Sequence, residues 1–186
     1  MSDLQSEVLE RLIRVRPLQD GAVHPRGAAD DEIQRFEDEM NVNLPSELRS
    51  WLKVCDGALV NPGCVYGLNF PADVNIGWYL REYPGWAQRR WFPIASDGCG
   101  DIYILDCEYL TPSTSTHPVV FLDQSDFAEP SYIVASGLLR FLFFLFESEI
   151  VADRGGEVFW PTCRDKVVAV DPAIEETTLP LPWNLD

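Results

Sequence analysis

The chain has 186 residues, of which 14 are lysine or arginine and 30 are aspartate or glutamate, so its formal net charge is −16 at neutral pH. This charge repels phosphate backbones and anionic membrane surfaces, which disfavours general nucleic-acid binding and membrane binding. Hydrophobic residues make up 46% of the chain, too many for a disordered protein. A chain of this length supports one hydrophobic core, so the sequence predicts a single domain.

The first part of the chain carries helical patterns. Leu4, Val8 and Leu12 recur at four-residue intervals, which predicts a first amphipathic helix that ends at Pro17. Residues 18–29 are rich in glycine and proline, which is typical of a loop.

Two further helices are expected between residues 30 and 57. The first begins near Asp30, whose carboxylate would cap the free backbone amides. The second takes Pro45 as its first residue and ends at Gly57, which tolerates the left-handed conformation that closes a helix. This helical pair carries too few cations to read DNA.

Short apolar runs separated by turn residues follow, and this pattern predicts strands. The expected strands are residues 65–68, 91–95, 102–105, 119–122 and 167–170. Asp97 and Gly98 stand between the second and third of these runs, and both tolerate the positive φ of tight turns, so an antiparallel hairpin is expected there. A helix from Leu138 to about Ser148 is apolar on almost every side and should be central to the core.

The acidic residues are unevenly distributed. Residues 1–91 carry 14 acids and 10 bases, whereas residues 92–186 carry 16 acids and 4 bases. No lysine or arginine stands between Arg90 and Arg140, so the acids there are uncompensated unless arginines reach them from elsewhere. An acidic surface attracts a basic partner, although acids can also serve solubility alone. The candidate partner-binding residues are Asp97, Asp101, Asp106, Glu108, Asp123, Asp126 and Glu129.

The sequence contains no convincing catalytic or metal-binding pattern. The two histidines, His24 and His117, stand in a loop and before a proline at a strand entrance, and no nucleophile motif accompanies them. The segment 98–100 lacks the third glycine of a phosphate-binding loop, and the nearby aspartates do not match a calcium loop. We therefore expect a protein that is not an enzyme, with no catalytic residue, metal or cofactor.

Location and thiol chemistry follow from two further features. The five cysteines are an odd number and include no Cys-x-x-Cys pair, which argues against a disulfide framework or a zinc site. The first residues have no basic segment followed by an apolar one, so a cytoplasmic protein is expected. The most apolar run, residues 138–146, is too short to span a membrane.

An aromatic tract occupies residues 78–91. Aromatic residues and arginine are enriched in binding hot spots, but they also dominate ordinary cores. We expect most of the tract in the core, with Arg81, Arg89 and Arg90 paired to carboxylates of the same protein.

The order of these segments resembles the SUKH superfamily, whose founding members are the Smi and Knr fungal cell-wall regulators. The resemblance spans most of the chain, with a core of about residues 28–148, an N-terminal helix and a C-terminal extension within residues 1–186. The motifs that carry it are residues 31–45 with their terminal Leu-Pro, Asp56-Gly57, the hairpin 92–101, Pro118-Val-Val-Phe, the helix from Leu138, Asp171-Pro172 and Leu181-Pro182-Trp183.

The resemblance implies an α+β fold with helices packed on a largely antiparallel (mixed) sheet. It also implies a bacterial immunity protein that binds and neutralises a cognate toxin domain of a contact-dependent or polymorphic toxin system, and a cationic nuclease would suit the acidic surface. The alternative is a scaffold or regulator of cell-wall synthesis that uses the aromatic tract. A metal-dependent hydrolase that uses the carboxylates is the weakest of the three hypotheses.

Overall fold

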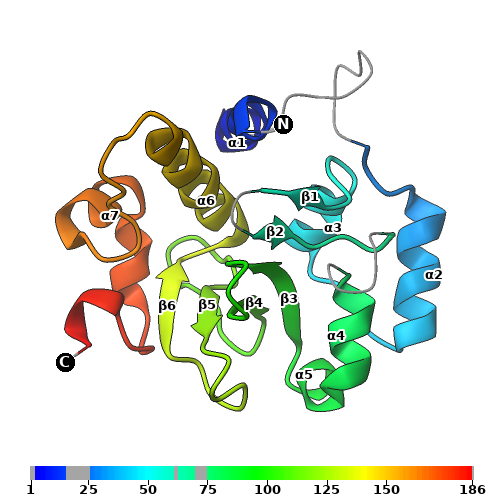
Figure 1. Cartoon of the computed structure of the whole chain (residues 1–186). Coiled ribbons are helices and arrows are strands. Elements are labelled where there is room, and N and C mark those ends of the chain that lie inside the picture. The colour runs from blue at the N-terminus through cyan, green and yellow to red at the C-terminus, as the bar shows by residue number, and fades with distance from the viewer. Residues whose placement is uncertain (1–2, 16–25, 61–62, 70–74, 186) are drawn as a thin grey trace.

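A computed structural model describes residues 3–15, 26–60, 63–69 and 75–185 (Figure 1). Its centre is a six-stranded antiparallel sheet in which each strand pairs with the next along the chain. The strands are β1 (Ala58–Leu59), β2 (Cys64–Val65), β3 (Trp91–Ser96), β4 (Ile102–Asp106), β5 (Val119–Leu122) and β6 (Tyr132–Ala135).

Helices surround this sheet. Among the described residues they are α1 (Asp3–Val15), α2 (Asp30–Met40), α3 (Ser46–Leu52), α4 (Ile76–Glu82), α5 (Pro84–Gln88), α6 (Leu138–Asp153) and α7 (Arg164–Val170), followed by the 3₁₀ helices η3 (Pro172–Glu176) and η4 (Pro182–Asn184). The predicted α+β fold is therefore confirmed.

The hairpin of β3 and β4 forms where the sequence predicted it. Ser96 pairs with Ile102, and Gly98 and Gly100 in the turn have φ values of 81° and 113°. The Asp97 carboxylate closes this turn by accepting hydrogen bonds from the backbone N–H groups of Cys99 at 2.8 Å and Asp101 at 3.1 Å. The residues that make the turn are thus also two of the candidate binding residues.

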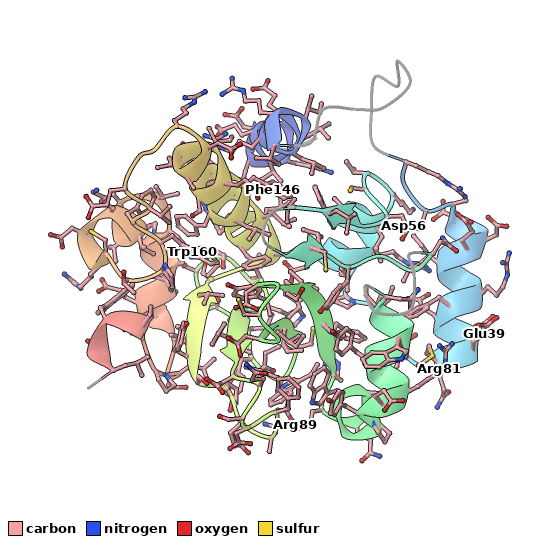
Figure 2. All side chains as sticks on the ribbon, viewed as in Figure 1. Glu39, Asp56, Arg81, Arg89, Phe146 and Trp160 are labelled. Atoms are coloured by element: carbon pink, nitrogen blue, oxygen red, sulfur yellow. The ribbon has the colours of Figure 1, made fainter. Side chains whose placement is uncertain are left out.

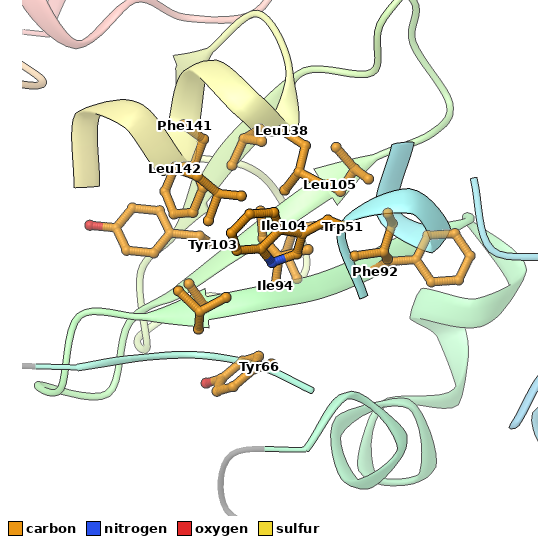
Figure 3. Packing of buried hydrophobic residues seen from close by; sticks show 14 of the residues in the cluster. Trp51, Tyr66, Phe92, Ile94, Tyr103, Ile104, Leu105, Leu138, Phe141 and Leu142 are labelled. Atoms are coloured by element: carbon orange, nitrogen blue, oxygen red, sulfur yellow. The ribbon is translucent and has the colours of Figure 1, made fainter. Parts of the chain in front are cut away.

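Helix α6 provides the centre of the core, as predicted. Figure 3 shows Leu138, Phe141 and Leu142 of α6 beside the side chains of β4. The rings of Phe141 and Tyr103 lie 4.9 Å apart, and every residue of β4 is buried. Helix α1 packs on the outer side of α6 through buried apolar residues, which is consistent with its predicted amphipathic pattern.

The helix boundaries differ from the prediction at three caps. Ala29, not Asp30, is the cap of α2, and its N–H donates to the Glu32 carboxylate at 2.8 Å. Pro45 is likewise the cap of α3 rather than its first residue. This helix ends at Leu52, and Gly57, with a φ of 87°, turns the chain toward β1 instead of closing the helix.

The strand predicted at residues 65–68 is shorter than expected. Strand β2 ends at Val65, although the Tyr66 N–H still donates to the Ile94 carbonyl at 2.8 Å. Beyond that point the backbone leaves the sheet because the buried Asp56 carboxylate binds the Leu68 N–H at 2.6 Å. Strands β1 and β6 and helices α4 and α5 were not predicted.

Residues 167–170 form part of α7, so the predicted strand there is wrong. The space it would need beside β6 is occupied, because the Ile133 N–H donates to the Pro180 carbonyl at 2.9 Å. The segment before α7 is held by Trp160, whose indole N–H donates to the Val134 carbonyl at 2.9 Å.

Candidate partner-binding surface

Four of the predicted acids lie at one end of the sheet, where strands β3 and β5 end and strand β4 begins. Asp97 and Asp101 stand in the β3–β4 turn, and Asp123 and Asp126 follow β5. The two segments are tied together, because the Gln124 N–H donates to Asp101 at 2.9 Å and the Gln124 side chain donates to the Cys99 carbonyl at 3.2 Å. We call these four aspartates the acidic end of the sheet.

The acidic end carries concentrated negative charge. Partial burial raises the pKa of Asp101, and the charges of Asp97 and Asp123 raise it further against the hydrogen bond from Gln124. The same three carboxylates add to burial in raising the pKa of the Tyr132 phenol. No lysine or arginine of the described residues forms an ion pair with any of the four aspartates. A cationic group placed there would relieve this repulsion.

The turn after β5 is held by local hydrogen bonds. Asp123 accepts hydrogen bonds from the N–H and the hydroxyl of Ser125 at 2.8 and 2.5 Å, and these bonds lower the pKa of its carboxyl group. Asp126 accepts a hydrogen bond from the Ala128 N–H at 2.9 Å. Both carboxylates therefore have a defined position before any partner binds.

Glu108 and Glu129 lie in a second group, around Arg89. The Arg89 guanidinium is 3.3 Å from the Glu108 carboxylate and 3.6 Å from that of Glu129. It also donates to the Ala128 carbonyl at 2.7 Å and lies 3.6 Å from the centre of the Trp91 ring. Arg89 thus pairs with carboxylates of its own protein, as predicted, and neutralises part of the acidic stretch.

Asp106 is fully buried and so does not belong to the surface where we expected it. It lies opposite Trp91 in the hairpin and accepts a hydrogen bond from the Glu108 N–H at 3.0 Å. Burial raises the pKa of its carboxyl group. Asp106 was included among the candidate partner-binding residues because the sequence does not reveal whether a charged residue in a strand faces the solvent or the core.

Replacing Arg89 with lysine is expected to lower the free energy of unfolding by about 1 kcal/mol, because an ammonium group cannot both stack on Trp91 and form several directed hydrogen bonds. Urea denaturation measures this change. The exposed Arg90, which has no ion pair among the described residues, provides the matched control Arg90→Lys. Equal losses in both variants would contradict the role assigned to Arg89.

The aromatic tract is largely part of the core, as predicted. Trp86 and Trp91 are buried, and the ring of Tyr83 stacks on Trp86 at 4.6 Å. Trp78, in contrast, is 37% exposed. Arg81 forms no ion pair with a carboxylate in the described part of the chain.

The remaining chemical groups are placed as follows. His117 contacts the Tyr109 carbonyl through Nδ1 at 2.8 Å, and its N–H donates to Glu47 at 2.9 Å, whereas His24 lies outside the described residues. No disulfide joins the five cysteines, all of which lie within the described residues. Within the described ranges, no cluster of three or more metal-ligating side chains occurs, and no helix has the length and apolarity needed to cross a bilayer.

Comparison with protein-family models gives a match that covers more than half of the chain. The family model described as the SMI1 / KNR4 family (SUKH-1) matches residues 27–143, which run from the start of α2 into α6. A search of the curated proteins returned no match. The matched span contains the acidic end, the surroundings of Arg89 and the aromatic tract.

Proposed function

Because the chain belongs to the SMI1 / KNR4 family (SUKH-1), we propose that it is a non-enzymatic immunity protein that binds and neutralises a basic toxin domain. The acidic end of the sheet makes the contact. The observation that supports this assignment best is the grouping of Asp97, Asp101, Asp123 and Asp126 without an ion-paired cation among the described residues.

A toxin nuclease suits this surface. Nucleases that hold nucleic acid need cationic surfaces, because phosphates must be neutralised on binding. An acidic inhibitor can cover such a surface and find it rapidly, since complementary charges raise association rates. The cytoplasm is the compartment where such an inhibitor would protect nucleic acid.

The whole chain acts as one domain in this proposal. Helix α1 is joined to α6 by the Arg11–Glu147 ion pair at 2.8 Å, and the C-terminal segment is joined to β6 through Trp160 and Asp171. These contacts support a core at residues 28–148 that an N-terminal helix and a C-terminal extension cover.

The second candidate function is a scaffold or regulator of cell-wall synthesis. The exposed Trp78 favours it, because tryptophan is enriched in binding hot spots and this side chain is accessible. In this case the aromatic tract, and not the acidic end, would contact the partner.

Capture of binding proteins from the native host distinguishes the two functions. The immobilised chain is exposed to extract at low salt and again at high salt, and the bound proteins are identified. We expect one cationic toxin domain that high salt releases, because surface charges are screened beyond about 8 to 10 Å at ordinary ionic strength. Several envelope-synthesis proteins retained in high salt would instead support the regulator function, and no bound cationic protein would count against the toxin.

A further inference from the structure

A pocket between α2 and α4 shares no residue with the acidic end. Its volume is about 370 Å³, and its lining includes Phe36, Glu39, Leu68, Asn75, Trp78 and Arg81. The volume falls within the range of pockets that enclose small ligands or a few side chains. The two helices that form its walls run beside each other in Figure 1.

One wall of this pocket is fixed by buried and half-buried hydrogen bonds. The Asp56 carboxylate binds the Leu68 N–H at 2.6 Å and the Asn69 side chain at 2.7 Å. The Asn75 side chain donates to the Leu68 carbonyl and accepts from the Gly77 N–H at 2.8 Å. The wall is therefore organised before anything binds, which reduces the entropy that binding would cost.

The charged residues of the pocket differ in how they are paired. Glu32 lies 3.4 Å from Arg26, and Arg35 lies 3.6 Å from Asp31. Glu39 of α2 and Arg81 of α4, which Figure 2 labels on the two neighbouring helices, both line the pocket and form no ion pair within the described part of the protein. Among the described residues, the pocket thus offers one negative and one positive charge that form no ion pair.

Aromatic surface lies close to these two charges. Trp78 is 37% exposed, and the buried Phe36 approaches α4 so closely that a Cβ atom on Gly77 would be 3.1 Å from its ring. A ligand with a single charge would satisfy either Glu39 or Arg81 and be repelled by the other. A ligand with both charges and an apolar group would satisfy all three features.

We propose that this pocket binds a short segment of a protein partner that carries a basic and an acidic side chain on either side of an apolar residue. The base pairs with Glu39, the acid pairs with Arg81, and the apolar side chain packs on Trp78. The pocket is separate from the acidic end, so a result that contradicts peptide binding in the pocket would leave the proposed function intact.

Peptide titration tests this proposal on the full chain. The probes are the capped peptides Lys-Leu-Glu, Lys-Leu-Lys and Glu-Leu-Glu, and the readout is the indole N–H resonance of Trp78, assigned with the variant Trp78→Phe. We expect Lys-Leu-Glu to shift this resonance and to bind about fivefold more tightly than either like-charged peptide, which corresponds to one exposed ion pair.

Charge-reversal variants make the test specific. In Glu39→Arg the pocket should prefer Glu-Leu-Glu, in Arg81→Glu it should prefer Lys-Leu-Lys, and the double variant should bind Lys-Leu-Glu again. Both residues are exposed, so the other resonances should report an unchanged fold. An absence of any Trp78 shift at about 10 mM peptide, or equal binding of the three peptides, would overturn the proposal.

Discussion

Replacing Asp171 with alanine is expected to lower the free energy of unfolding by about 4 kcal/mol, because it leaves two buried donors without a partner. Asp171 is 1% exposed, and its carboxylate accepts hydrogen bonds from the Ser136 N–H at 2.7 Å and the Ser136 hydroxyl at 2.5 Å. Ser136 follows β6, and Asp171 follows α7, so the substitution also removes one of the contacts that join the C-terminal segment to the sheet. Urea denaturation measures the loss.

The variant Asp171→Asn is the control for this substitution, because an amide can accept from one Ser136 donor and donate to the hydroxyl oxygen. The free energy of unfolding should fall in Asp171→Asn by less than half of the amount lost in Asp171→Ala. An alanine variant as stable as the unmodified chain would contradict the role of this contact.

Stability should depend on pH through the same residue. Burial raises the pKa of Asp171, and the hydrogen bonds from Ser136 oppose that rise. A raised pKa in the folded state means that protonation favours folding, so this contribution is fully present below the ordinary aspartate pKa of about 4 and is lost as the pH rises. The stability advantage of the unmodified chain over Asp171→Asn should therefore shrink as the pH increases above about 4.

Replacing Asp97, Asp101 and Asp123 together with asparagine is expected to slow association with the captured toxin domain by about 10 to 100-fold at low salt. Asparagine keeps an acceptor for the hydrogen bonds that close the turns, so the fold should be retained. At high salt the two association rates should converge, because screening removes the long-range attraction. Stopped-flow mixing measures both rates.

The matched control for this experiment replaces Glu108 and Glu129 with glutamine. Arg89 already neutralises part of their charge, so the effect on association should be small. If these two substitutions slowed association as much as the three aspartate substitutions did, net charge and not the acidic end would govern binding.

Local sequence signals predicted the parts of the fold that depend on neighbouring residues. Asp97 and Gly98 supplied the turn chemistry of the hairpin, and the apolar run from Leu138 supplied the central helix. Each of these elements carries its determinants within a few residues. They were therefore readable without knowledge of the rest of the chain.

Other features depend on contacts that no local pattern records. Residues 167–170 contain three valines and were predicted as a strand, but the edge of β6 is taken by the Pro180 segment, and the chain there is helical. The burial of Asp106 follows from its register opposite Trp91. Glu39 and Arg81 line the same pocket between α2 and α4, although about forty positions separate them in the sequence.

The candidate site was predicted in composition but not in arrangement. The stretch without lysine or arginine led to the prediction of an acidic binding surface, but only the fold separates the acidic end from the residues that Arg89 compensates. Arg81, Arg89 and Arg90 of the aromatic tract were all expected to pair with carboxylates, and among the described residues Arg89 alone of the three does so. The packing of α5 beside β3 determines which carboxylates Arg89 reaches.

Growth of a bacterium that expresses the captured toxin domain tests the central claim most directly. Cells receive the toxin alone, with the unmodified chain, or with the Asp97, Asp101 and Asp123 to asparagine variant at the same expression level. We expect the unmodified chain to restore growth and the variant to fail. If the unmodified chain gave no protection, the proposal that it neutralises the toxin would be contradicted. If the variant protected as well as the unmodified chain, neutralisation would stand, but the acidic end would not be the binding surface.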